Sequence, residues 1–347
     1  MKGIRGKIGA WILLGTASSP FAFAQDLFWS DFANGLIHAA PLNGSEPRAI
    51  VSGSIVAPRG LAIDRVHGKL YWADSGAARI QRANFDGSVI EDVIREGLSV
   101  PRGVALDIAR GTIYWTDSGT QKIQRANLDG SEIEDLISSG LVSPHRIALD
   151  LPAGKMYWTD TRVFDPGRIA RSNLDGTGIE ELVVGLGSPV GLALDFQEGK
   201  MYWADSVNRR IERANLDGSQ VELLLNTSAV PIGLALDPRK LLVYWTGAVP
   251  NGAGSLFRAN LERCVQGPRQ RRCLVEEFFR TEGASPRGLA LMRCGEGDSE
   301  FERDALRCLD GPAEFAAFVC LCADLNDDMR VDLMDIAIYQ RAFPPSP

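Results

Sequence analysis

Histidine is scarce in this chain of 347 residues, which contains only three. His38, His67 and His145 lie far apart in the sequence, so no histidine-based zinc site or catalytic triad suggests itself. A serine elbow and a phosphate-cradling glycine loop are also missing. A long basic run is absent, and a formal net charge of −7 argues against nucleic acid as a partner. The sequence therefore favours a non-enzymatic role without deciding against an enzyme.

Long apolar runs are missing as well. The run from Ile8 to Leu14 follows three basic residues and is followed by small residues up to Ala24. This order is typical of a secretory signal peptide, whereas the alternative, a membrane anchor, needs about 20 apolar residues. We predict a signal peptide over 1–24, cleavage near Ala24, and a secreted or extracytoplasmic chain that does not span a membrane.

Cysteine is absent from the first 263 residues. In an exported chain, six cysteines suit structural disulfides better than a redox site. Cys264 and Cys273 bracket a short insertion and are predicted to form a local disulfide. The remaining four cysteines are Cys294, Cys308, Cys320 and Cys322. They allow three pairings, among which the sequence does not choose. We expect Cys308 to pair with Cys320 or Cys322.

What the sequence does contain is a repeat with a period near 43 residues. Six motifs, LFWSD, LYWAD, IYWTD, MYWTD, MYWAD and VYWTG, end at Asp31, Asp74, Asp117, Asp160, Asp205 and Gly247. Such a period indicates one supersecondary unit per repeat. Each motif holds one tryptophan, and we expect these side chains to be interior packing: Trp29, Trp72, Trp115, Trp158, Trp203 and Trp245.

Each repeat predicts four short strands. The first follows a proline and is apolar on both faces, as in 101–107 (PRGVALD), and the second carries the aromatic motif. The third ends in an Asp-Gly turn, as in 123–130 (IQRANLDG), which is a strong hairpin signal. Strands that are apolar on both faces fit sheets packed between neighbours. The fold class is therefore all-β, a six-bladed β-propeller.

The order of the strands predicts how the ring closes. The chain begins with an aromatic second strand at Leu27, and a sixth proline-led strand, Pro286 to Leu291, follows the last motif. This strand fits the gap in the first blade, where its pairing would remove exposed sheet edges.

At these residues the sequence resembles the YWTD, or class B, repeats of the low-density-lipoprotein receptor family, over residues 25–293. It departs from the pattern at Gly247, which replaces an aspartate, and at Arg146, which replaces a glycine, so we expect local distortion in those two blades. The resemblance implies a non-enzymatic propeller that binds protein ligands on one face or packs against adjoining modules. It names no ligand and transfers no catalytic residue.

The motif aspartates form a ring that could be mistaken for a metal site. Equivalent positions in successive blades lie far apart, whereas a metal needs several ligands within 2 to 3 Å. We therefore interpret them as strand-end carboxylates that accept backbone or arginine hydrogen bonds. Two arginine sets could supply partners, and the sequence does not choose between Arg59, Arg102 and Arg287 in first strands and Arg82, Arg125, Arg171, Arg213 and Arg258 in third strands.

The predicted ligand surface is the face where loops after the aromatic strands meet those before the first strands. A solvated loop is the plain alternative for each charged residue there. Phe32 and Phe164 are better candidates, since an apolar side chain on an exposed loop favours binding. The candidate residues are Phe32, Asn34, Arg79, Lys122, Arg162, Phe164, Asp165, Asn208, Arg209 and Arg210.

The repeat stops at residue 294, and the segment 294–347 contains the spacing of a calcium loop. Side-chain oxygens fall at positions 1, 3, 5, 9 and 12, and a carbonyl at position 7, in Asp324, Asn326, Asp328, Asp332, Asp335 and Arg330. The segment resembles a degenerate type I dockerin with a helix after the loop, which implies Ca²⁺ and a cohesin-like or cell-surface partner. Met329 replaces the preferred glycine, and the alternative is a plain acidic helix start.

Two functions from different classes follow. The first is a secreted protein-binding or scaffolding propeller with a calcium-ordered docking tail. A purely structural cell-envelope component is a third possibility. The second is a calcium-dependent hydrolase or lactonase with its site in the axial channel, which the fold does not exclude. Three or more Asp, Glu or Asn oxygens at the channel mouth would distinguish the second from the first.

Overall fold

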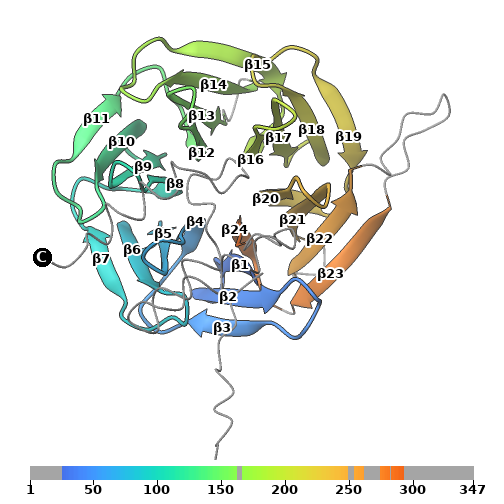
Figure 1. The fold of residues 1–347 in the computed structure, drawn as a ribbon, viewed down its shortest axis with the longest axis horizontal. Helices are drawn as coiled ribbons and strands as arrows, with labels where there is room; N and C mark the ends of the chain where they lie inside the picture. Colours follow the sequence, from blue (N-terminus) through green and yellow to red (C-terminus); the bar gives the residue numbers. More distant parts are fainter. Residues whose placement is uncertain (1–25, 162–165, 249–253, 262–273, 282, 293–347) are drawn as a thin grey trace, which may run out of the picture.

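The computed structural model describes residues 26–161, 166–248, 254–261, 274–281 and 283–292. These residues form six four-stranded antiparallel sheets, arranged as blades around a central axis (Figure 1). In each blade the proline-led strand lies nearest the axis and the last strand lies at the rim. The predicted six-bladed β-propeller is confirmed.

The blades have closely similar strand lengths. Blade one contains β24 (Pro286–Leu291), β1 (Asp26–Asp31), β2 (Leu36–Pro41) and β3 (Arg48–Val51). Blade two contains β4 (Pro58–Asp64), β5 (Lys69–Asp74), β6 (Arg79–Asn84) and β7 (Glu91–Ile94). Blade three contains β8 (Pro101–Asp107), β9 (Thr112–Asp117), β10 (Lys122–Asn127) and β11 (Glu134–Ile137).

The second half of the ring repeats this arrangement. Blade four contains β12 (Pro144–Asp150), β13 (Lys155–Asp160), β14 (Gly167–Asn173) and β15 (Glu180–Leu186). Blade five contains β16 (Pro189–Asp195), β17 (Lys200–Asp205), β18 (Arg210–Asn215) and β19 (Glu222–Asn226). Blade six contains β20 (Val230–Asp237), β21 (Leu242–Ala248), β22 (Gly254–Asn260) and β23 (Val275–Thr281).

The ring closes in blade one, as predicted. Strand β24 pairs antiparallel with β1, with Leu27 opposite Leu291 and Trp29 opposite Leu289. Figure 1 shows the two ends of the propeller, drawn blue and orange, side by side in this blade. The last strand of the repeat region thus completes the first blade and covers an edge that would otherwise be open.

The core lies between the blades. All six motif tryptophans are fully buried. The cluster between blades two and three joins Tyr71 and Ile80 of one blade to Trp115 and Val104 of the next. Each blade contributes its first motif aromatic, Phe28 in blade one and a tyrosine in the other five, to one neighbour and its tryptophan to the other, so adjacent sheets share a packed interface.

Around the axis the blades approach too closely for a side chain at most positions. A Cβ added at Gly288 of β24 would overlap the carbonyl oxygen of Arg59 in β4, and one added at Gly103 of β8 would lie 2.5 Å from the carbonyl oxygen of His145 in β12. This close approach accounts for the glycine in five of the six first strands: Gly60, Gly103, Gly191, Gly233 and Gly288.

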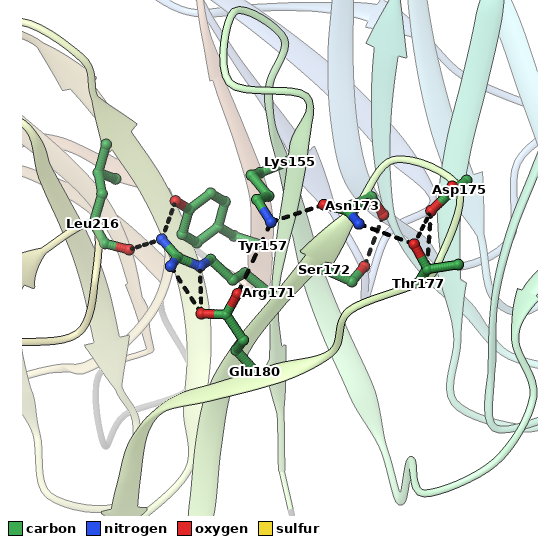
Figure 2. A network of polar contacts seen from close by, with 9 residues as sticks. All are labelled: Lys155, Tyr157, Arg171, Ser172, Asn173, Asp175, Thr177, Glu180 and Leu216. Atoms are coloured by element: carbon green, nitrogen blue, oxygen red, sulfur yellow. Dashed lines mark hydrogen bonds and ion pairs between the residues drawn. The ribbon is translucent and has the colours of Figure 1, made fainter.

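In three of the blades, an arginine of the third strand donates a hydrogen bond to the next blade. Arg171 donates to the Leu216 carbonyl in blade five at 3.1 Å, and also to Glu180 at 2.8 Å and the Tyr157 hydroxyl at 3.4 Å (Figure 2). Arg82 and Arg125 make the same carbonyl contact with blades three and four. These bonds satisfy carbonyls in the turns, which have no partner strand.

The Asp-Gly turns have the predicted hairpin chemistry. In blade four, Asp175 accepts hydrogen bonds from the amide and hydroxyl of Thr177 at 2.9 and 2.6 Å (Figure 2). Gly176 has a φ of 83°, a conformation that favours glycine. A Cβ there would also overlap the Leu136 carbonyl of blade three, so this glycine serves both the turn and the packing of blades.

The distortion expected in blade four is not present in its backbone. Strand β12 has seven residues, as β8 does, and the Arg146 amide donates to the Thr159 hydroxyl at 3.0 Å. The Gly103 amide makes the equivalent bond to Thr116 at 2.9 Å. Arginine therefore replaces glycine without changing the hydrogen bonding of the strand, and its side chain lines the axial channel.

The other expected distortion concerns Gly247 in blade six. Ala229 and Phe257 occupy the space next to this glycine, where a Cβ would lie 2.8 Å from each. The motif's strand, β21, runs on to Ala248, which pairs with Val230. Side-chain packing and an extra strand pair thus take the place of the aspartate.

The predicted helical calcium-loop segment lies outside the described residues.

Buried Glu212 in blade five offers a test of the packing between blades. It accepts a hydrogen bond from the Trp203 ring nitrogen at 3.1 Å, the role that Gln124 fills beside Trp115. Burial raises the pKa of Glu212, although the bond from Trp203 opposes this. A carboxyl with a raised folded-state pKa stabilises the fold when protonated, and that stabilisation is lost as pH rises above its unfolded value, about 4.3.

We therefore expect Glu212→Gln to stabilise the protein by about 1 kcal/mol at pH 7 and to do little at pH 4, because glutamine keeps the acceptor without a buried charge. Urea unfolding at both pH values measures this. The reciprocal variant, Gln124→Glu, should destabilise blade three at pH 7. An equal effect of Glu212→Gln at both pH values would contradict the assignment.

Candidate binding face and axial pocket

The motif aspartates accept hydrogen bonds from backbone amides of the neighbouring loops. Asp117 accepts hydrogen bonds from the amides of Ser99 and Val100, before β8, at 2.7 and 2.9 Å. It also accepts from Gly119 and Thr120, after β9, at 2.8 and 3.0 Å. Asp74 and Asp205 repeat this pattern in their own blades. Each of these three carboxylates therefore accepts hydrogen bonds from two loops of its blade, as the backbone interpretation predicts.

Asp31 also accepts hydrogen bonds from two loops, the one after β1 and the one before β24. Burial alone would raise its pKa, but His38, the Ser285 amide and Asn34 outweigh burial and bring the pKa to about 2. The Ser285 bond, at 2.9 Å, joins the loop before β24 to the end of β1. The carboxylate that closes the ring is therefore ionised throughout the physiological range.

The two arginine sets differ in what they contact. The third-strand set pairs with glutamates of the fourth strands, as Arg82 does with Glu91 at 2.6 Å and Arg258 with Glu276 at 2.8 Å. The first-strand set lines the axis. In the described structure, neither set donates hydrogen bonds to the motif aspartates. Asp160 accepts one at 3.0 Å from Arg168 of β14, which belongs to neither set.

The axial channel holds a pocket of about 160 Å³. Four of its lining residues are arginines, each from a different blade: Arg287, Arg59, Arg102 and Arg146. His145 and Ser206 add polar groups, and apolar side chains line the part formed by blades five and six: Val190, Val230 and Ile232. None of these lining residues is a carboxylate, so the described residues give a calcium ion no acidic ligand here.

A β-bulge in every first strand positions these arginines. In blade two, Pro58 is opposite Asp74 and Leu61 is opposite Trp72, so Arg59 and Gly60 share a single partner residue. The same shift occurs in the other five blades. Bulges redirect side chains, and here the residue after the proline of every first strand lines the channel, joined in blade four by Arg146.

Serine hydroxyls orient two of the four guanidinium groups. Arg59 donates from Nε to Ser75 Oγ at 2.6 Å, and Arg102 donates likewise to Ser118 Oγ at 2.6 Å. The guanidinium of Arg59 lies over the ring of Phe32, with its Cζ atom 4.5 Å from the ring centroid. The Cζ atom of Arg287 lies 5.3 Å from the same centroid. Cation–π contacts of this kind stabilise a cation without neutralising it.

The charges in the pocket repel one another. Burial, together with Arg102 and Arg287, lowers the pKa of Arg59 to about 9, and burial lowers the pKa of Arg146 to about 10. Burial and all four arginines hold the pKa of His145 well below its ordinary value. At pH 7 the pocket therefore carries four guanidinium charges beside a neutral imidazole.

The residues predicted to form the ligand face begin where the aromatic strands end, at the same end of the blades as Arg59. Phe32 is partly buried and contacts the axial arginines, whereas Asn34, Arg79, Asn208 and Arg209 are exposed. Several make local contacts: Asn34 and Asn208 with motif aspartates, and Arg79, Lys122 and Arg210 with Asp92, Asp135 and Glu212.

Other predicted residues lie outside the described residues. These are the loop residues Arg162, Phe164 and Asp165, the cysteine pair Cys264 and Cys273, and the entire calcium loop. In the described part of the chain, no three His, Cys, Asp or Glu side chains gather as metal ligands. No helix in that part is long and apolar enough to cross a membrane.

The axial pocket was not predicted, although the sequence carries a signal for it. The third residue of the proline-led strand is glycine in five repeats and Arg146 in one, and the second residue is arginine in three. Once these positions are known to face the axis, the four arginines form one cluster. Without the bulge, their common direction is not evident.

Comparison with known proteins agrees with this architecture. The family model for low-density lipoprotein receptor repeat class B matches residues 25–65, 68–108, 111–151 and 199–238. A chain in the crystal structure of a nidogen/laminin complex is 27% identical, with a TM-score of 0.68, over 78% of this chain and all of that one. None of the curated proteins compared with the chain matches it. The chain thus contains class B, or YWTD, repeats within a six-bladed propeller.

Proposed function

We propose that this chain is a secreted protein-binding or scaffolding propeller that uses the face containing Phe32, Arg79 and Arg209. The carrying observation is that the motif aspartates fix the loops of this face in pairs, as Asp117 does through four backbone amides. Fixed loops lose little conformational entropy when a partner binds, which favours recognition. The similarity to a chain of a nidogen/laminin complex supports a protein as partner.

The tail is proposed to bind one Ca²⁺ ion and to dock the propeller to a cohesin-like or cell-surface partner. The sequence supports this by placing oxygen ligands at the required positions of a single loop: Asp324, Asn326, Asp328, Arg330, Asp332 and Asp335. Four carboxylates in one short loop repel one another, so calcium would couple to the folding of this segment. The axial channel, lined by arginines, lends no support to the alternative of a calcium-dependent hydrolase.

The test is a pull-down from the source organism's secreted fraction, with the full chain as bait, in calcium and in chelator. The double variant Arg79→Glu/Arg209→Glu should lose a partner that the wild-type chain retains in both conditions, because it reverses charge on the proposed face. The matched control is Lys240→Glu, an exposed lysine in the loop between β20 and β21, at the opposite end of the blades.

Each half of the proposal has its own outcome. A partner bound only in calcium supports the docking tail, and its loss in a chain ending at residue 293 assigns it to the tail. If the double variant and Lys240→Glu capture the same proteins as the wild-type chain, the proposed face is not the binding surface. If chelator changes nothing, the calcium-dependent tail is wrong.

A further inference from the structure

The four axial arginines keep hydrogen-bond donors that no described residue satisfies. Arg59 and Arg102 use Nε for serine, and no hydrogen bond or ion pair in the described structure engages their terminal nitrogens. The Nε atom of Arg287 is buried without any acceptor. A buried donor normally has a partner, so the Nε atom of Arg287 is unusual among the donors that line this pocket. Guanidinium groups with free, converging N–H groups are suited to carboxylate, sulfate and phosphate oxygens.

Of the four pocket arginines, Arg146 has the weakest structural explanation. The other five first strands have glycine at its position, because a Cβ there meets the neighbouring blade. Its side chain makes no hydrogen bond or ion pair within the described residues. Its Nη1 atom lies 2.9 Å from the place where a Cβ on Gly60 would be, so the guanidinium reaches across the channel to blade two. Packing alone would be served equally well by glycine.

The pocket is positively charged, whereas the whole chain is acidic. Concentrating cations in a channel without a lining carboxylate costs electrostatic energy in the free protein. An oxyanion at the centre would offset this repulsion and satisfy the free donors. The apolar side chains of Val190, Val230 and Ile232 line the opposite part of the pocket, where a small carbon skeleton would fit.

We propose that the axial pocket is a binding site for one compact, multivalent oxyanion, a phosphate, sulfate or polycarboxylate group, held by Arg59, Arg102, Arg146 and Arg287. The site does not depend on the proposed protein-binding function, because a small anion would occupy it in the isolated chain.

Binding of sulfate should strengthen as pH falls. The groups facing His145 are Arg59 on β4, Arg102 on β8, Arg146 on its own strand β12, and Arg287 on β24. Their charges and burial lower the pKa of His145 in the free protein, and a bound anion would raise it again. Protons are therefore taken up on binding, so affinity for sulfate, whose own charge does not change near neutral pH, should rise as pH falls below 7, and His145→Gln should remove much of that rise.

The experiment is calorimetric titration and thermal melting of the full chain with sodium phosphate, sulfate and citrate at constant ionic strength. We expect one saturable site and a rise in melting temperature of roughly 5 °C at 100 times the dissociation constant. Comparing phosphate and sulfate with citrate distinguishes a tetrahedral oxyanion from a polycarboxylate, and saturable binding of either supports the site.

Arg146→Gly is the decisive variant, since it restores the residue of the other five strands. It should weaken binding at least tenfold, while its melting temperature without anion stays the same or rises. Arg59→Met should also weaken binding, and Arg95→Met, at an arginine that is 71% exposed and paired with Asp92, should not. Absence of saturable binding, or equal affinity in Arg146→Gly and wild type, would overturn the proposal.

Discussion

A chain that ends at Ser285 should lose cooperative folding, with a cost on the order of 5 kcal/mol or more, comparable to the whole stability of many domains. The truncation removes β24 with its buried Leu289, the buried Met292 that follows this strand, and the bond from the Gly288 amide to Ser30 Oγ at 2.7 Å. It also exposes β1, in which all six residues are buried. An open, apolar strand edge of this kind promotes aggregation.

The control is a chain that ends at residue 293, which keeps β24 and lacks only the tail. Differential scanning calorimetry of both chains separates closure of the ring from any contribution of the tail. Where the shorter chain does not express, Gly288→Val in the full chain offers a second measurement, because its side chain would collide with the Arg59 carbonyl. Cooperative melting of the Ser285 chain at the temperature of the control would show that β24 does not close the ring.

Trp115→Ala should destabilise the protein by about 3–5 kcal/mol, because it opens a cavity between blades two and three. Trp115 is fully buried in the cluster that contains Tyr71, Ile80 and Val104. Its ring nitrogen donates to Gln124 Oε1 at 3.1 Å, so the variant also leaves a buried acceptor without its donor. Equilibrium unfolding in urea measures the free energy of unfolding.

Two phenylalanine variants separate the cavity from the hydrogen bond. Trp158 is buried like Trp115, but its ring nitrogen has no hydrogen-bond partner. Trp115→Phe should therefore cost about 1 kcal/mol more than Trp158→Phe, which loses only packing. If alanine at position 115 cost no more than phenylalanine, the tryptophan would not be filling the space between the blades.

The sequence by itself determined the blade count, the place of every first and second strand, and the closure by residues 286–291. It could do so because each blade buries the same side chains against its neighbours. The Trp and Tyr positions, the prolines and the Asp-Gly turns therefore recur with one period. The structural role of the motif aspartates followed from the same regularity, since positions repeated around a ring do not converge on one metal.

Only the tertiary structure decided which departures from the repeat matter. The sequence marked Arg146 as a possible distortion, but the strand keeps its geometry and the arginine enters the channel. Nor could the sequence show that the first-strand arginines face one another, because that depends on a bulge repeated in every blade. Residues from four blades meet at the axis only when the ring is closed, and contacts between positions so distant in the chain leave no local pattern.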